Sequence, residues 1–253
     1  MTGSLPVRSG PAAAISAHRG GIEDAPEGTY EAYQAAARTG AEYIEFDIRR
    51  TADDELVVYH AAAVDGDKAL TDISYATLSE LAGYNVPRVQ DVMRLIAGKA
   101  IGHLDLKEIG DEHVVIELAL EILGAGNFVA TTLEDVSVAA IKARFPAVPV
   151  ALSLGRDVGQ ESWRTRLSSR RGELYPLSRI HACGADWAAI NRRIALLGAL
   201  RQCHRHGIRT MIWTVNSDTM IARWLADSRV DVLVTDRPRR AIALREQLPR
   251  RAK

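Results

Sequence analysis

The residues best suited to chemistry are carboxylates placed within short apolar runs. Glu45 and Asp47 alternate with apolar residues in YIEFDI (43–48), and Asp105 does the same in IGHLDL (101–106). Because side chains alternate across a strand, the acids of each run share one face and the apolar residues share the other. Three converging carboxylates with no thiolate describe a site for a hard cation. We therefore expect Glu45, Asp47 and Asp105 to bind Mg²⁺ or Ca²⁺.

Two histidines each end an apolar run: His18 is the last residue of AAISAH (13–18), and His60 is the last residue of LVVYH (56–60). Imidazoles titrate near neutral pH, so two of them on different elements can divide proton removal and proton donation at a metal-bound phosphate. Lys107 has the same strand parity as Asp105, and its charge would neutralise phosphoryl oxygens. These residues together predict acid–base chemistry on a phosphate ester.

The elements that must position these groups are apolar runs that alternate with longer amphipathic segments, which is typical of βα units around a parallel sheet. Only RRTADDE separates YIEFDI from LVVYH, which is too short for a parallel crossover. LVVYH should therefore return as a hairpin arm over the C-terminal mouth of a TIM (β/α)8 barrel. The other expected strands are FVATT (128–132), VPVALSL (148–154), WAAI (187–190), RTMIWTV (209–215) and VDVLVT (230–235).

Apolar residues at helical spacing predict the helices between these strands. The expected ranges are 29–40, 89–99, 111–126, 133–145, 192–207 and 217–228, with a solvated final helix in the cationic stretch 237–253. The segment 155–182, rich in arginine and serine, has no clear pattern.

The bulk properties fit one enzyme-sized domain. A length of 253 residues matches a single barrel over 1–253, and we expect 1–12 to be flexible. Basic and acidic residues number 32 each, so the chain has no net positive charge that would attract it to nucleic acid or to an anionic membrane. Cys183 and Cys203 lack the spacing of a disulfide framework or a zinc site, and we expect no signal peptide and no transmembrane segment. We expect a cytoplasmic protein with a small-molecule substrate and leave its oligomeric state open.

The order of the motifs resembles the glycerophosphodiester phosphodiesterase family over about residues 16–240. The segments that carry the resemblance are HRGGIEDAPEGT, GAEYIEFDIRRTADDELVVYH, LDLK, MIWTVNSD and VDVLVTDRP. The resemblance implies a metal-dependent TIM-barrel hydrolase that releases glycerol 3-phosphate and an alcohol, through attack of a glycerol hydroxyl and a cyclic phosphate. It implies these roles: His18 and His60 as the acid–base pair, Glu45, Asp47 and Asp105 as metal ligands, and Arg19 and Lys107 as phosphate contacts.

Three positions depart from the family pattern. The family usually has Asn at the position of Gly28, Asp at that of Ala61 and Glu at that of Asp105, while Asp-Leu-Lys is also typical of the related sphingomyelinase D enzymes. These differences leave two alternatives. One is a lysophospholipase D or sphingomyelinase D-like activity on lipids, favoured by any apolar entrance loop near 155–163. The other is a non-catalytic, phosphodiester-binding barrel.

Several further residues have two readings. Trp213 is either a pocket wall for the glycerol or the leaving alcohol, or an ordinary core tryptophan. Glu27 either supports the metal or caps the first helix. Arg49, which shares the parity of Glu45 and Asp47, could pair with them and give their burial a purely structural meaning. We expect structural roles for His103, one layer below Asp105, and for Thr235, Asp236 and Pro238.

Overall fold

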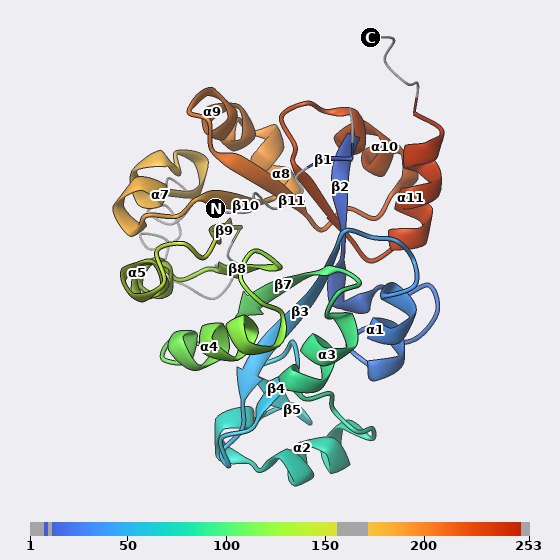
Figure 1. Ribbon diagram of the computed structural model, residues 1–253, viewed down its shortest axis with the longest axis vertical. Coiled ribbons are helices and arrows are strands. Elements are labelled where there is room, and N and C mark those ends of the chain that lie inside the picture. Colours follow the sequence, from blue (N-terminus) through green and yellow to red (C-terminus); the bar gives the residue numbers. More distant parts are fainter. Residues whose placement is uncertain (1–7, 10–11, 156–171, 249–253) are drawn as a thin grey trace.

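The structure is a computed structural model that describes residues 8–9, 12–155 and 172–248. Its centre is a closed barrel of parallel strands (Figure 1). Strand β12 pairs with β2, and β2 pairs with β3, which closes the ring and confirms the TIM barrel. The barrel strands are β2 (Ala12–Ala17), β3 (Tyr43–Arg50), β7 (Ile101–Leu106), β8 (Phe128–Thr132), β9 (Val150–Leu154), β10 (Trp187–Asn191), β11 (Arg209–Trp213) and β12 (Val232–Thr235).

The strand faces separate as the alternation predicts. Phe46 and Leu104 point outward and belong to the large core cluster between the barrel and its helices. A separate interior cluster fills the lower part of the barrel, with Tyr43, Trp187 and Met211 among its buried members. The apolar residues therefore occupy both the outer layer and the barrel floor, and the polar residues of β3 and β7 are left near the mouth.

The hairpin arm is also present. Strand β4 (Leu56–Val58) pairs antiparallel with β3, with Val58 opposite Ile48. The chain then forms a small layer of its own, at the bottom of Figure 1, whose apolar cluster includes Leu70 and Leu78. This layer contains β5 (Ala63–Val64), β6 (Lys68–Ala69), the 3₁₀ turn η2 (Leu70–Asp72) and helix α2 (Tyr75–Ala82), which no sequence pattern had indicated.

The remaining helices surround the barrel (Figure 1). The prediction of a single helix over 192–207 was wrong, because the segment forms two helices, α8 and α9, separated at Gly198. The φ of Gly198 is 115°, in a region that favours glycine. Helix α7 was not predicted. The helices are α1 (Tyr30–Ala36), α3 (Val89–Ile96), α4 (Glu112–Ile122), α5 (Asp135–Arg144), α7 (Leu177–Cys183), α8 (Arg192–Leu196), α9 (Ala199–Arg205), α10 (Asp218–Ala226) and α11 (Pro238–Glu246), with the 3₁₀ turn η1 (His18–Gly20) after β2.

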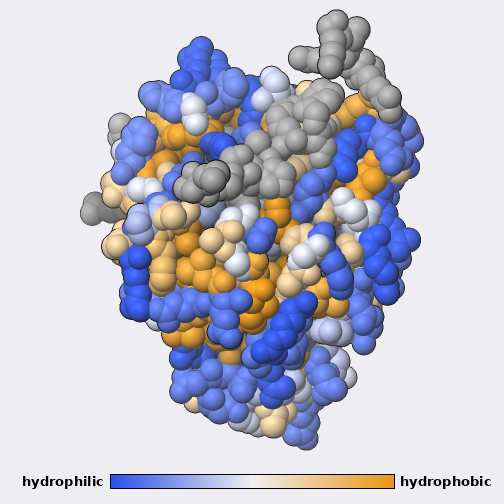
Figure 2. All heavy atoms as spheres, viewed as in Figure 1, coloured by the Kyte–Doolittle hydropathy of each residue, from blue (hydrophilic) through white to orange (hydrophobic). Residues whose placement is uncertain are grey.

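The ends and the surface add little to the site. Strand β1 (Arg8–Ser9), within the segment expected to be flexible, pairs antiparallel with β2, while 1–7 and 10–11 lie outside the described residues. Hydrophilic residues dominate the outline of the molecule in Figure 2. Among the described residues, none of the helices combines the length and apolar character needed to cross a bilayer.

Candidate active site

The three predicted metal ligands meet at the barrel mouth. Strands β3 and β7 are neighbours, and their register places Asp47 beside Asp105. One oxygen atom from each of Glu45, Asp47 and Asp105 lies within 4.8 Å of the others. Glu45 and Asp47 are buried, and Asp105 is half-buried. The strand parity thus correctly indicated which carboxylates share a face and come together.

The electrostatics of this triad fit a hard cation. Burial, together with the charge of Asp47, raises the pKa of Glu45 to about 8. Burial also opposes ionisation of Asp47, but a hydrogen bond from His60 and the charges of Lys107 and Arg19 bring its pKa well below the usual range. Glu45 is therefore the member of the triad whose charged form is least favourable in this environment, and a cation beside it would stabilise that form. A divalent cation with oxygen ligands matches this donor set.

Two protein cations border the triad. Lys107 Nζ lies 2.7 Å from Asp47 Oδ1 and also forms an ion pair with Asp105. Burial acts against the charge of Lys107, but the two carboxylates raise its pKa, so it remains an ammonium. Arg19 Nε lies 3.0 Å from Asp47 Oδ2, and the Arg19 backbone N–H donates to Glu45 Oε2 at 2.8 Å. Both predicted phosphate contacts therefore lie beside the carboxylates.

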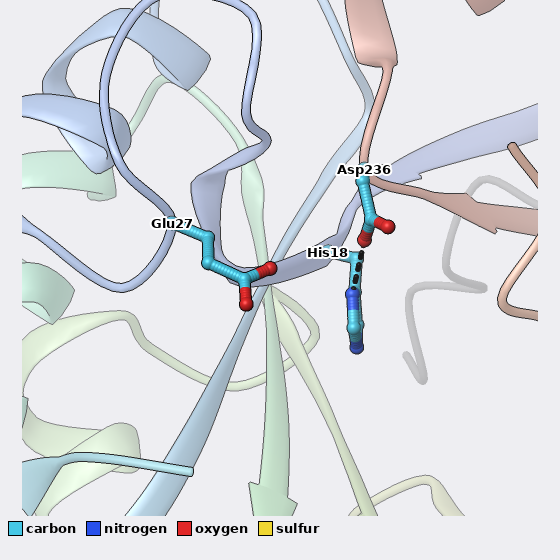
Figure 3. A group of neighbouring side chains, drawn as sticks. All are labelled: His18, Glu27 and Asp236. Atoms are coloured by element: carbon cyan, nitrogen blue, oxygen red, sulfur yellow. Dashed lines mark hydrogen bonds and ion pairs between the residues drawn. The ribbon is translucent and has the colours of Figure 1, made fainter.

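His18 is held by an acid from the far end of the chain. Its Nδ1 lies 2.5 Å from Asp236 Oδ1, and its Nε2 lies 4.0 Å from Glu45 Oε2. Figure 3 shows Asp236, directly after β12, above the imidazole, and Glu27 to the left of it, with its carboxylate toward the imidazole. Burial lowers the pKa of His18, but Glu45 and Asp236 outweigh this effect, and the net shift is upward.

Asp236 was predicted to be structural, and its contact with His18 was not foreseen from the sequence. The Asp236 N–H donates to Asn216 Oδ1 at 3.0 Å, and Asn216 Nδ2 donates to Asp236 Oδ2. Asn216 therefore fixes the position of the carboxylate that contacts the imidazole. The available signal was its position, because a carboxylate directly after the last strand of a closed barrel must lie beside the end of the first strand.

His60 reaches the site from the hairpin arm. It follows β4 on the hairpin arm, and its Nδ1 lies 2.9 Å from Asp47 Oδ2. Its side chain is 52% exposed. His18, His60 and Trp213 line one cavity of about 240 Å³, together with Arg19, Glu45, Asp105 and Lys107. Trp213 Nε1 donates to the Ala189 carbonyl at 2.9 Å, so the predicted pocket wall is held by a backbone contact.

A buried polar chain lies below Asp105. His103 Nδ1 is 3.0 Å from Ser16 Oγ, and His103 Nε2 is 3.2 Å from Thr131 Oγ1. Thr131 donates its hydroxyl hydrogen to Asp105 Oδ1 at 2.6 Å, so it must accept from His103 Nε2–H. Burial lowers the pKa of His103 to about 4, which keeps the ring neutral. His103 thus lies one layer deeper, as expected, while Ser16 and Thr131 were not predicted.

Two alternative readings fail. Arg49 pairs with Glu108 at 2.7 Å, and no ion pair joins it to Glu45 or Asp47 among the described residues. Glu27 does not cap the first helix, because Thr29 Oγ1 accepts the hydrogen bond from the Ala32 N–H. Glu27 instead lies 3.0 Å from Arg19. Pairing with Arg49 therefore does not account for the burial of Glu45 and Asp47.

Comparison with known proteins agrees with this geometry. The model of the "Glycerophosphoryl diester phosphodiesterase family" matches residues 18–240. A glycerophosphodiester phosphodiesterase of Caldanaerobacter subterraneus subsp. tengcongensis is 24% identical over 251 residues, which cover 91% of this chain and 96% of the relative.

Solved structures share the fold. A glycerophosphodiester phosphodiesterase from Parabacteroides distasonis has a TM-score of 0.75 at 19% identity, covering 92% of this chain and 97% of the other. An Oleispira antarctica phosphodiesterase in complex with the product sn-glycerol-3-phosphate has a TM-score of 0.72 at 18% identity, covering 93% and 97%. Because the family model spans most of the sequence and the barrel carries the motif residues at its mouth, the chain belongs to the glycerophosphoryl diester phosphodiesterase family of enzymes.

Proposed function

We propose that the chain hydrolyses glycerophosphodiesters to glycerol 3-phosphate and an alcohol, with His18 and His60 as its acid–base pair. The observation that carries the proposal is the shared anchoring of the two rings. Each imidazole has Nδ1 against a carboxylate, Asp236 for His18 and Asp47 for His60, and both rings line the same cavity. An anchored Nδ1 leaves Nε2 of each ring for proton transfer with a substrate.

His18 is proposed as the base of the first step. Its neutral form donates Nδ1–H to Asp236 and presents an Nε2 lone pair, and the raised pKa makes that nitrogen a stronger proton acceptor. In this step His18 takes the proton from the glycerol hydroxyl beside the phosphate. The freed oxygen attacks phosphorus and forms a cyclic phosphate, as the bond to the leaving alcohol breaks.

His60 is proposed as the acid of the same step, because it lines the same cavity as His18 from a different element and is open to solvent. It protonates the departing alcohol oxygen. In the second step the roles reverse: His60 takes a proton from water, the water oxygen opens the cyclic phosphate, and His18 returns its proton to the glycerol oxygen. The products are one glycerol 3-phosphate and one alcohol, and both histidines regain their initial states.

The reaction also requires that the negative charge on the phosphoryl oxygens be neutralised. Arg19 and Lys107 line the cavity and supply fixed positive charge. Glu45, Asp47 and Asp105 would hold Mg²⁺ or Ca²⁺, which supplies Lewis-acid stabilisation when bound. Trp213 is proposed as the wall against which the glycerol packs.

The alternatives have less support. An apolar entrance loop near 155–163 would favour lipid substrates, but 156–163 lie outside the described residues. The Oleispira relative holds sn-glycerol-3-phosphate, which supports a glycerol phosphate moiety in the site proposed here. Family membership and the retained acid, base and carboxylate positions favour an enzyme over a non-catalytic barrel.

A substrate panel tests the proposal. Purified protein is incubated with glycerophosphodiesters and lysophospholipids in Mg²⁺, in Ca²⁺ or in chelator, and the phosphate-containing products are identified. We expect glycerol 3-phosphate from glycerophosphodiesters, with activity lost in chelator and restored by one of the metals. Turnover that requires an acyl chain would favour the lipid reading. No cleavage of any substrate by metal-replete protein would contradict the proposed function.

A further inference from the structure

A cavity among the outer helices lies apart from the proposed active site. It has a volume of about 350 Å³ and shares no lining residue with the cavity at the barrel mouth. Its walls come from two separate parts of the chain. One part is the end of α8 and the start of α9, and the other is the end of α10 with the loop after it. The space is therefore formed by packing between helices and not by one stretch of sequence.

Three arginines give this arginine cavity its character: Arg201 from α9, Arg223 from α10 and Arg229 from the following loop. No carboxylate is among the described residues that line it. Basic and acidic residues are equal in number over the whole chain, so three guanidinium groups around one space are a local excess of positive charge. Like charges that converge raise the free energy of the folded state unless an anion lies between them.

The three guanidinium groups differ in their partners. Asp227 accepts two contacts from Arg229, from Nε at 2.9 Å and from Nη2 at 2.6 Å, and so fixes the orientation of this planar group. Arg201 and Arg223 form no ion pair with a carboxylate in the part of the chain that the structure describes. The guanidinium carbon of Arg223 instead lies 5.5 Å from the centre of the Trp224 ring. Within these residues, two of the three charges are thus left for a ligand to neutralise.

Trp224, which also lines the arginine cavity, gives a second and independent sign of a missing partner. The residue is 1% exposed, and its indole Nε1 is buried without a hydrogen-bond acceptor among the described residues. A buried N–H without an acceptor is costly. In the wall of a cavity lined by cations, this N–H favours an acceptor that a ligand supplies.

We propose that the arginine cavity binds the phosphate group of a monoester, at a site separate from the proposed active site. A tetrahedral phosphate accepts hydrogen bonds from several guanidinium groups at once, whereas a carboxylate offers two oxygens and one charge. Leu196 and Leu197, 52% and 70% exposed, line the same space and suit the organic part of the ester. That part belongs to a soluble phosphate ester or to a lipid, and the phosphate chemistry is the same in both.

The main test is a titration of isotope-labelled protein with inorganic phosphate, followed by NMR through the indole N–H resonances. Trp224 reports on the arginine cavity and Trp213 on the cavity at the barrel mouth, and Trp224→Phe and Trp213→Phe assign the two signals. We expect the Trp224 signal to move to saturation in the wild type. Arg201→Gln and Arg223→Gln should each weaken this binding about tenfold and leave the Trp213 response unchanged. Sodium chloride at the same ionic strength should not reproduce the movement.

Arg205→Gln is the matched control, because it removes the same charge from the exposed side of α9 and Arg205 does not line the arginine cavity. Co-sedimentation with phosphatidylcholine vesicles, with or without phosphatidic acid, separates the two sources of phosphate. Wild-type binding that needs phosphatidic acid and is lost in Arg201→Gln assigns the site to a lipid, whereas phosphate binding without vesicle binding assigns it to a soluble ester. A stationary Trp224 signal, a movement matched by chloride, or equal phosphate affinity in Arg201→Gln and Arg205→Gln would overturn the inference.

Discussion

The two sides of the active site are built differently. His18 follows a barrel strand, its side chain is 16% exposed, and a carboxylate held by Asn216 anchors it at 2.5 Å. His60 follows the hairpin arm, its side chain is 52% exposed, and its anchor, Asp47, lies at 2.9 Å. The histidine on the barrel strand is thus held by hydrogen-bonded side chains and shielded from solvent, whereas the histidine on the hairpin arm is open to solvent. We expect this difference in exposure to make the two histidines unequal in how readily solvent can replace them.

The strongest test of this comparison is His18→Ala. The variant should lose about 10⁴-fold in kcat, because no water can enter the shielded position with the same orientation and take the proton. Steady-state hydrolysis of a glycerophosphodiester by metal-replete protein measures the effect, with circular dichroism as the check on folding. A smaller loss than in His60→Ala would reverse the comparison.

His60→Ala should have a smaller effect, a fall in kcat of about 10³-fold. Its position is open to solvent, so water or an added imidazole can replace part of the proton transfer. Added imidazole should restore measurable activity to His60→Ala and little to His18→Ala. Equal rescue of the two variants would mean that the difference in exposure has no consequence for catalysis.

Asp236→Asn tests the anchor of His18. We expect a loss of about 10²-fold in kcat at the pH optimum, because the amide does not hold the neutral imidazole with its proton on Nδ1. The charge of Asp236 contributes to the raised pKa of His18, so its removal lowers that pKa. Since the base must be neutral, the acidic limb of the profile of kcat/KM against pH should move to lower pH. An unchanged limb would show that Asp236 only supports the fold.

The smallest effect concerns the layer below the triad. Thr131→Val removes the hydrogen bond to Asp105 and should weaken metal binding about tenfold, with kcat at saturating metal changed little. Calorimetric titration with Mg²⁺ or Ca²⁺ measures this directly. Thr132→Val is the matched control, because the neighbouring side chain lies on the other face of β8. If both variants bind metal like the wild type, the polar chain does not position Asp105.

The sequence by itself determined which side chains of the barrel strands point into the barrel near its mouth. Alternation along β3 and β7 is a local property of extended chain, so YIEFDI and IGHLDL were enough to place Glu45, Asp47 and Asp105 on one face. Loop length, also local, was enough to identify β4 as a hairpin arm. The split of 192–207 into two helices was missed because the apolar spacing continues through Gly198.

Only the tertiary structure decided which groups support these residues. Asp236 and His18 are 218 positions apart, and they meet because β12 pairs with β2 when the barrel closes. Thr131 reaches Asp105 because β8 lies beside β7 in a register that no local pattern specifies. The cavity lined by Glu27, His60 and Tyr84 likewise forms only where the first loop, the hairpin arm and the segment before α3 come together. Such contacts depend on how distant segments are aligned, whereas side-chain alternation depends only on the strand itself.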